Sequence, residues 1–85
     1  MSEIDVLRKD IDRLDKEICD LLLARFEVVR GIGEIKKRDA LPVTNAGREE
    51  EVIAKVRSTA TAEEDKRALE AIYRKVIEES KNLEK

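Results

Sequence analysis

The sequence predicts an all-α domain of three helices: a long one, a short one and one of medium length. Its apolar residues are mostly aliphatic and recur at alternating steps of three and four, which is the spacing of one packed helix face. The 85 residues include only three glycines and one proline, so few positions interrupt a helix. The length fits a single domain over residues 1–85. With 45% charged and 2% aromatic residues, a large core within one chain is not expected.

The first helix is expected over residues 3–38, with a length on the order of 50 Å at 1.5 Å per residue. Ser2 is a suitable N-cap, with Asp5 in the first turn. An apolar stripe runs along the whole helix and has a single polar member, Arg25. Its members are Ile4, Leu7, Ile11, Leu14, Ile18, Leu21, Arg25, Val28, Ile32 and Ile35. A guanidinium on a buried stripe is costly unless an anionic group meets it.

Two glycines, Gly31 and Gly33, lie inside this helix. Each lowers helix stability by up to ~1 kcal/mol relative to Ala. They either admit the close approach of another backbone or a ligand, or they are simply tolerated, and the sequence does not distinguish the two. A loop is expected over residues 38–44, because Pro42 disfavours the helical conformation of the residue before it.

Two further helices follow the loop. Asn45 is a good N-cap for a helix over residues 46–58. Thr61-Ala62-Glu63-Glu64 has the pattern of a capping box and is expected to open a third helix that ends near Leu83. This helix carries a second stripe, also with one polar member: Leu69, Tyr73, Val76, Ser80 and Leu83. A polar residue on the packing face of each of two helices predicts a polar, charged pocket between them.

Composition excludes several classes of function. A net charge of −2 argues against general nucleic-acid binding, which needs a basic face. With no histidine and one cysteine, the usual zinc sites and an intrachain disulfide are excluded, and we expect no metal and no cofactor. Cys19 is interpreted as a small buried hydrophobe. No signal peptide or transmembrane run is evident, so a cytoplasmic protein with no membrane partner is expected.

The long first helix extends beyond what the other two can cover and would leave an apolar patch. We therefore predict a homodimer that pairs the long helices. Arg8 and Lys36 lie on one line of this helix but roughly 42 Å apart along a straight axis, too far for one site in one subunit. An antiparallel pairing would bring the partner subunit's Arg8 toward the stretch between Arg25 and Lys36, and two-fold symmetry would make two equal sites.

Cations and hydrogen-bonding groups are thus expected around one space between helices. They are Arg8, Arg25, Lys36, Arg48, Glu49 and Ser80. Arginine forks bind carboxylates in a bidentate manner, so the pattern suits a small ligand with two carboxylates. Taken singly, Arg8, Lys36, Arg48 and Glu49 are typical solvated charges, and Arg25 is equally typical of one half of an intersubunit ion pair. No nucleophile with a base and no phosphate loop is present, which leaves electrostatic and conformational catalysis.

Several segments, taken together, have the pattern of a known family. They are Leu7-Arg8, Ile11, Leu14-Asp15, Leu23-Ala24-Arg25, Gly33-x-x-Lys36, Pro42-Val43, Arg48-Glu49 and Ile77-Glu78-Glu79-Ser80. In these segments, which extend over nearly the whole chain, the sequence resembles the all-α (AroQ-class) chorismate mutases. The resemblance implies three-helix chains in an intertwined homodimer with two active sites, which convert chorismate to prephenate by a [3,3] rearrangement.

The resemblance also implies roles for individual residues. Arg25 and Arg8 of the other subunit would bind the two substrate carboxylates, and Ser80 would support a carboxylate. Lys36 would bridge a carboxylate and the ether oxygen, which gains negative charge as its C–O bond breaks. Glu84 would be the second donor to that oxygen. The rate enhancement would come from holding a chair-like conformer of the substrate and from stabilising the charge that grows in the transition state. The catalytic residues would be Lys36, Glu84 and Arg25.

At the ring end of the substrate, Glu49 and the backbone of Asn45 would hold the hydroxyl, and Arg48 would add positive potential. Two positions depart from the commonest family pattern. Glu84 stands where many bacterial members carry Gln, and Asn45 stands where Asp is common. A carboxyl group donates a hydrogen bond only when it is protonated. If Glu84 is the donor to the ether oxygen, we expect activity to fall as pH rises.

Two other functions fit the same sequence. An isochorismate–pyruvate lyase would use the same fold, but its substrate carries the hydroxyl at a different ring carbon, and Glu49 favours the mutase. A non-catalytic helical dimer, acting as an interaction or regulatory module, would use Arg25 only as half of an ion pair.

Overall fold

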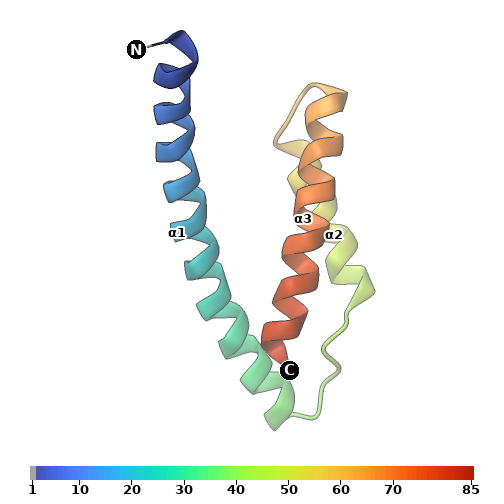
Figure 1. Ribbon diagram of the computed structural model, residues 1–85. Helices are drawn as coiled ribbons and strands as arrows, with labels where there is room; N and C mark the ends of the chain where they lie inside the picture. Colours follow the sequence, from blue (N-terminus) through green and yellow to red (C-terminus); the bar gives the residue numbers. More distant parts are fainter. Residues whose placement is uncertain (1) are drawn as a thin grey trace.

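The computed structural model describes residues 2–85, which form three α-helices and no strand (Figure 1). They are α1 (Glu3–Arg38), α2 (Ala46–Ser58) and α3 (Glu63–Glu84). The predicted fold class and the bounds of the first two helices are confirmed, and α3 ends one residue later than expected. None of these helices combines the length and the apolar character that a membrane span requires.

Side chains cap the first two helices as the sequence predicts. Ser2 Oγ accepts a hydrogen bond of 3.1 Å from the backbone N–H of Asp5. Asn45 Oδ1 accepts one of 3.1 Å from the backbone N–H of Arg48. Each cap satisfies one of the N–H groups that the first turn of a helix leaves without a partner.

The predicted capping box of the third helix is wrong. The N-cap of α3 is Ala62, one residue after Thr61, and no side chain caps this end. Thr61 therefore lies one position too early for its hydroxyl to serve the first turn. Three acidic residues occupy that turn instead, where they interact favourably with the positive end of the helix dipole: Glu63, Glu64 and Asp65.

The third helix holds the fold together. It packs against both α1 and α2, whereas α1 and α2 do not pack on each other (Figure 1). The buried apolar residues among those described are Val29, Ile53 and Ile77, one from each helix. The core is therefore small, and it is divided between the contact of α3 with the C-terminal half of α1 and its contact with α2.

Ion pairs add to the packing between α2 and α3. Arg57 contacts Glu63 at 2.7 Å and Glu70 at 2.9 Å, and Arg74 contacts Glu70 at 2.8 Å and Glu50 at 3.4 Å. Hydrogen bonds from Arg74 and then Arg57 lower the pKa of Glu70 below its ordinary value. This network joins the two helices.

The N-terminal half of α1 extends away from α3 (Figure 1). All residues from 2 to 21 are exposed, including Leu7 at 62% and Leu21 at 71%. The predicted stripe is therefore not buried within one chain. The neighbouring line of α1 is the one that meets α3, with Val29 and Gly33 buried. Cys19, predicted to be buried, is exposed because no other helix of the chain reaches it.

The dimensions of the chain agree with an uncovered helix. A compact monomer of this mass exposes about 5,100 Å², whereas this chain exposes 6665 Å². Its radius of gyration is 16.2 Å, against about 12 Å for a compact domain of this length. Both differences come from a first helix that is longer than the rest of the chain can cover.

Candidate active site

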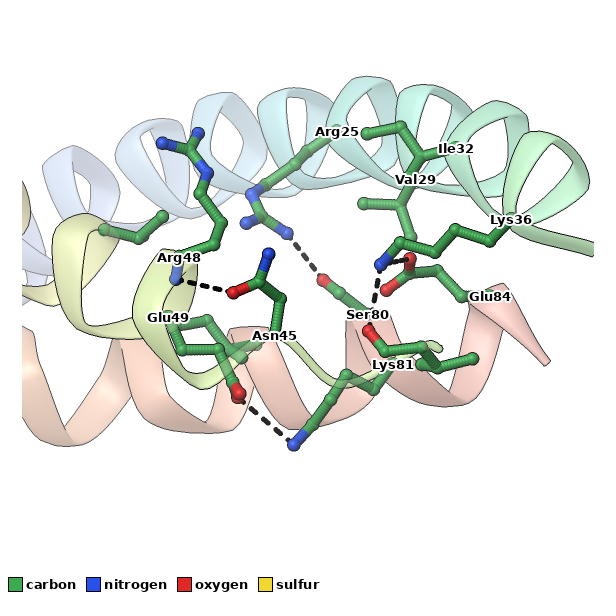
Figure 2. Close-up of a pocket in the computed structure, with 13 residues that line it drawn as sticks. Arg25, Val29, Ile32, Lys36, Asn45, Arg48, Glu49, Ser80, Lys81 and Glu84 are labelled. Atoms are coloured by element: carbon green, nitrogen blue, oxygen red, sulfur yellow. Dashed lines mark hydrogen bonds and ion pairs between the residues drawn. The ribbon is translucent and has the colours of Figure 1, made fainter. Parts of the chain in front are cut away.

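An open pocket of about 270 Å³ lies between the three helices (Figure 2). Its polar lining residues are Arg25, Lys36, Asn45, Arg48, Glu49, Ser80, Lys81 and Glu84. Its apolar lining residues are Val29, Ile32, Val43, Val52 and Ile77. Of the eight residues that the sequence singles out, seven line this one pocket, although they come from segments up to 59 residues apart. The eighth, Arg8, does not.

Helix periodicity explains why these side chains converge. Arg25, Ile32 and Lys36 lie on one face of α1, because residues three or four apart lie one above the other on a helix. The lining residues of α3 have the same spacing. At the third side of the pocket, the Asn45 cap begins α2 and so puts Arg48 and Glu49 in its first turn (Figure 2).

Arg25 reaches across from α1 to α3. Its guanidinium donates a hydrogen bond of 2.5 Å to Ser80 Oγ and lies 5.4 Å from the ring centre of Tyr73. The Ser80 hydroxyl in turn donates to the carbonyl of Val76 at 2.7 Å, and Ser80 is 5% exposed. Both partners of Arg25 are uncharged, and it makes no ion pair within residues 2–85. Its positive charge is therefore available to an anion in the pocket.

Lys36 and Glu84 face each other at one end of the pocket (Figure 2). Lys36 Nζ lies 2.6 Å from Glu84 Oε1 and donates to the carbonyl of Val43 at 2.9 Å. Glu84 is only 8% exposed, and its Oε1 makes no directed hydrogen bond among the described residues. The Lys36 ammonium is the charged group that compensates this buried oxygen. An ammonium and a carboxyl group thus lie together on the pocket wall.

A further cation, which the sequence pattern did not single out, lines the pocket. Lys81 on α3 forms an ion pair of 3.1 Å with Glu49 on α2 (Figure 2). Both side chains are mostly buried, at 29% and 24% exposure. Lys81 follows Ser80 directly and lies four residues after Ile77, so its place on the same helix face was the available signal.

Arg48 and Arg8 are placed differently from the other cations. Arg48 lies at the rim, where its exposed side chain contacts Glu51 of the same helix at 3.2 Å. Arg8 lies in the exposed part of α1 and contacts Asp5 at 3.7 Å. Within one chain, the predicted site residues therefore converge on the pocket, except for Arg8.

The charges of the pocket indicate the kind of ligand that it suits. Four cationic side chains and two carboxylates line it, which leaves a surplus of two positive charges in a protein of net charge −2. A small dianion would neutralise that surplus, and the arginine would offer it a planar fork. Residues 2–85 contain no cluster of histidine, cysteine or acidic side chains that could hold a metal ion.

Comparison with known sequences supports this interpretation. Residues 7–85 match the family model of type II chorismate mutase. The chain is 38% identical, over its whole length, to a bifunctional chorismate mutase/prephenate dehydratase of Aquifex aeolicus. It is 40% identical, over 73% of its length, to the T-protein of Enterobacter agglomerans. The chain spans 25% and 17% of the lengths of these two relatives, which are therefore much longer proteins.

Solved structures with the same fold cover the chain almost completely. The chorismate mutase of Thermus thermophilus matches 98% of this chain and 94% of its own, with a TM-score of 0.90 and 29% identity. A conserved hypothetical protein of Pyrococcus furiosus matches 100% of this chain and 99% of its own, with a TM-score of 0.83 and 33% identity. With a family model that matches from the first helix to the last residue, this chain belongs to the type II chorismate mutase family.

Proposed function

We propose that this chain converts chorismate to prephenate in the pocket between its three helices. The observation that carries the proposal is the convergence of Arg25, Lys36, Ser80 and Glu84 on one pocket with a surplus of positive charge. The rearrangement breaks one C–O bond and forms one C–C bond within a single dianionic molecule. It needs no nucleophile and no cofactor, only a site that holds a folded conformer and stabilises charge.

Arg25 would bind a substrate carboxylate. Its guanidinium is held by Ser80 and by the ring of Tyr73, so it is oriented before a ligand arrives. Because those partners carry no charge, no ion pair within the described chain has to be broken first. A carboxylate would then receive a charge-assisted hydrogen bond from a donor that is already in place.

Lys36 and Glu84 would act at the ether oxygen. This atom gains negative charge as the C–O bond breaks, so donors aimed at it stabilise the transition state more than the substrate. Lys36 has an ammonium on the pocket wall, and Glu84 lies 2.6 Å from it. Glu84 would donate only in its protonated form.

Glu49 would accept a hydrogen bond from the ring hydroxyl, together with the backbone at Asn45, while Arg48 adds positive potential at the rim. Glu49 forms an ion pair with Lys81, and its second carboxylate oxygen can accept such a bond. Glu49 therefore favours a substrate whose hydroxyl lies at this side of the pocket.

The active form would be a homodimer in which α1 pairs with α1 of a second chain. The uncovered stripe on α1 provides an apolar surface that suits such a pairing, and the large exposed area of the single chain supports it. The partner subunit's Arg8 would complete each pocket and bind the second carboxylate. A location in the cytoplasm stays a prediction.

The test is an assay of the purified protein with chorismate, with the product identified and Arg25→Ala as the control. Formation of prephenate that is lost in Arg25→Ala is the expected result. The same assay with isochorismate separates the two enzymes: release of pyruvate from isochorismate, with no turnover of chorismate, would identify a lyase. A folded dimer that turns over neither substrate would contradict an enzymatic function.

A further inference from the structure

Gly33 on α1 and Glu84 on α3 contact each other backbone to backbone. A Cβ atom built on Gly33 would lie 2.7 Å from both the Cα and the main-chain oxygen of Glu84. Carbon atoms in contact normally stay about 3.5–4.0 Å apart, so position 33 has no room for a side chain. A Cβ on Gly31, two residues earlier, would have nothing within 4 Å. No glycine among the described residues has a positive φ, so space and not backbone conformation requires glycine at position 33.

A second contact joins the same two chain segments. Lys37 Nζ donates a hydrogen bond of 2.9 Å to the main-chain oxygen of Lys85. Gly33 and Lys37 lie four residues apart, hence one turn apart on one face of α1. The end of α3 is therefore held against α1 at two successive turns.

This docking brings a side chain into the pocket. Lys36 lies between Gly33 and Lys37 in the sequence, and its ammonium meets the carboxyl group of Glu84 at 2.6 Å. Glu84 is the last residue of α3, where helix ends commonly fray. Yet it is 8% exposed, and its backbone lies directly against Gly33.

We propose that Gly33 is a positioning residue, which sets the place of the Glu84 carboxyl group beside Lys36. This inference rests on the proposed function, because the Glu84 carboxyl matters only if the pocket catalyses the rearrangement. Gly33 itself touches no substrate; it acts through the backbone of Glu84. Of the two glycines in α1, only Gly33 has this role.

The experiment compares Gly33→Ala with Gly31→Ala. Both substitutions gain the same helix propensity, but only Gly33→Ala forces the end of α3 to move, by about 1 Å. A displacement of that size predicts a loss in kcat on the order of 10–100-fold with a smaller change in KM. Gly31→Ala should keep kcat within about twofold, since it adds a methyl group in open space. Equal kcat values for the two variants would overturn the inference.

A double variant separates positioning from general disruption. In the Glu84→Ala background, Gly33→Ala should cause no further loss in kcat, because the group that it displaces is already absent. A further loss as large as that in the parent protein would overturn the inference, since Gly33 would then act independently of Glu84.

A measurement without substrate keeps this inference distinct from the proposed function. Amide hydrogen exchange at residues 81–84 should be faster in Gly33→Ala than in Gly31→Ala, and equal rates would contradict the docking role. If the parent protein fails to convert chorismate, the proposed function fails and this comparison alone tests the contact. If Gly33→Ala does not fold, Lys37→Met removes the second contact without adding bulk. It should lower kcat in the parent protein and have no effect in the Glu84→Ala background; no loss in the parent protein would count against the proposal.

Discussion

Arg25 donates a hydrogen bond of 2.5 Å to Ser80 across the contact between α1 and α3. These two residues are the polar interruptions of the apolar stripes on their helices, and in the folded chain each is a partner of the other. The pair explains how a hydroxyl is tolerated on the packing face of α3: Ser80 accepts a hydrogen bond from Arg25 and donates one to the carbonyl of Val76. It does not neutralise Arg25, so the positive charge on this face remains to be matched by a ligand or a second chain.

Arg25→Ala is therefore expected to reduce activity much more than stability. Ser80 keeps its hydrogen bond to Val76 in the variant, and Arg25 is only half-buried, so the loss in unfolding free energy should be about 1 kcal/mol or less. The loss of an oriented donor to a carboxylate should lower kcat/KM on the order of 100-fold or more. Urea unfolding and steady-state kinetics on chorismate measure the two effects. Turnover that is unchanged in Arg25→Ala would mean that Arg25 does not bind a substrate carboxylate.

Mixing two inactive variants would test whether Arg8 acts across the dimer. If the partner subunit's Arg8 completes each pocket, Arg8→Ala and Arg25→Ala are each inactive. A mixed dimer of the two, however, carries one site with both arginines and one with neither. Random exchange of subunits should restore roughly a quarter of the parent activity. No recovery after proven exchange would mean that Arg8 does not act in trans.

The helices were predictable because their apolar periodicity and two of their three N-caps are local properties of the sequence. The site was predictable to the extent that its residues interrupt those patterns, as Arg25 and Ser80 do, or match a family motif. Lys81 was harder to predict. Its spacing from Ile77 places it on the pocket face of α3, but a lysine on a charged helix is usually solvated, and only the ion pair with Glu49 distinguishes it. The role of Gly33 depends on a contact 51 residues away, which no local pattern encodes.

Lys81→Met should weaken substrate binding. The substitution keeps the length of the side chain but reduces the surplus of positive charge in the pocket from two to one. For a dianionic substrate at close range, the loss of one cation should raise KM about 5–10-fold. The increase should shrink at high ionic strength, because salt screens the interaction that was lost.

Two control variants accompany that measurement. Lys81→Arg keeps the charge and should keep KM near the parent value. Lys75→Met removes a lysine from the same helix, but at a position that is 65% exposed and outside this pocket, and it should leave KM unchanged. A KM that does not respond to Lys81→Met at low salt would show that Lys81 serves only to join α2 and α3.

Glu84→Gln should change the shape of the pH–rate profile. The carboxyl group donates to an ether oxygen only when it is protonated, whereas the amide donates at every pH. Activity of the parent protein should therefore fall as pH rises, and that of Glu84→Gln should stay level over the same range. The ratio of the two kcat values, measured from acidic to neutral pH, tests this directly. Parallel profiles would exclude Glu84 as the donor.

Glu70→Gln should lower stability in a pH-dependent way. Hydrogen bonds from Arg74 and Arg57 lower the pKa of Glu70 in the folded chain below its ordinary value of 4.5. A carboxyl group with a depressed folded pKa stabilises the fold fully above its unfolded pKa. That contribution is then lost as pH falls through the lower, folded value.

The difference in urea midpoint between the parent protein and Glu70→Gln should thus be largest near neutral pH. It should begin to shrink as the pH drops below about 4.5, and it should vanish once Glu70 is protonated in both states. Glu78→Gln is the matched control: Glu78 lies on the same helix, is 61% exposed and pairs with Lys75 within one turn. Such exposed pairs contribute little, so Glu78→Gln should move the midpoint less at every pH. A midpoint difference for Glu70→Gln that does not change with pH would contradict this prediction. The charge of Glu70 would then not contribute to stability, and the amide would act by disturbing the packing between α2 and α3.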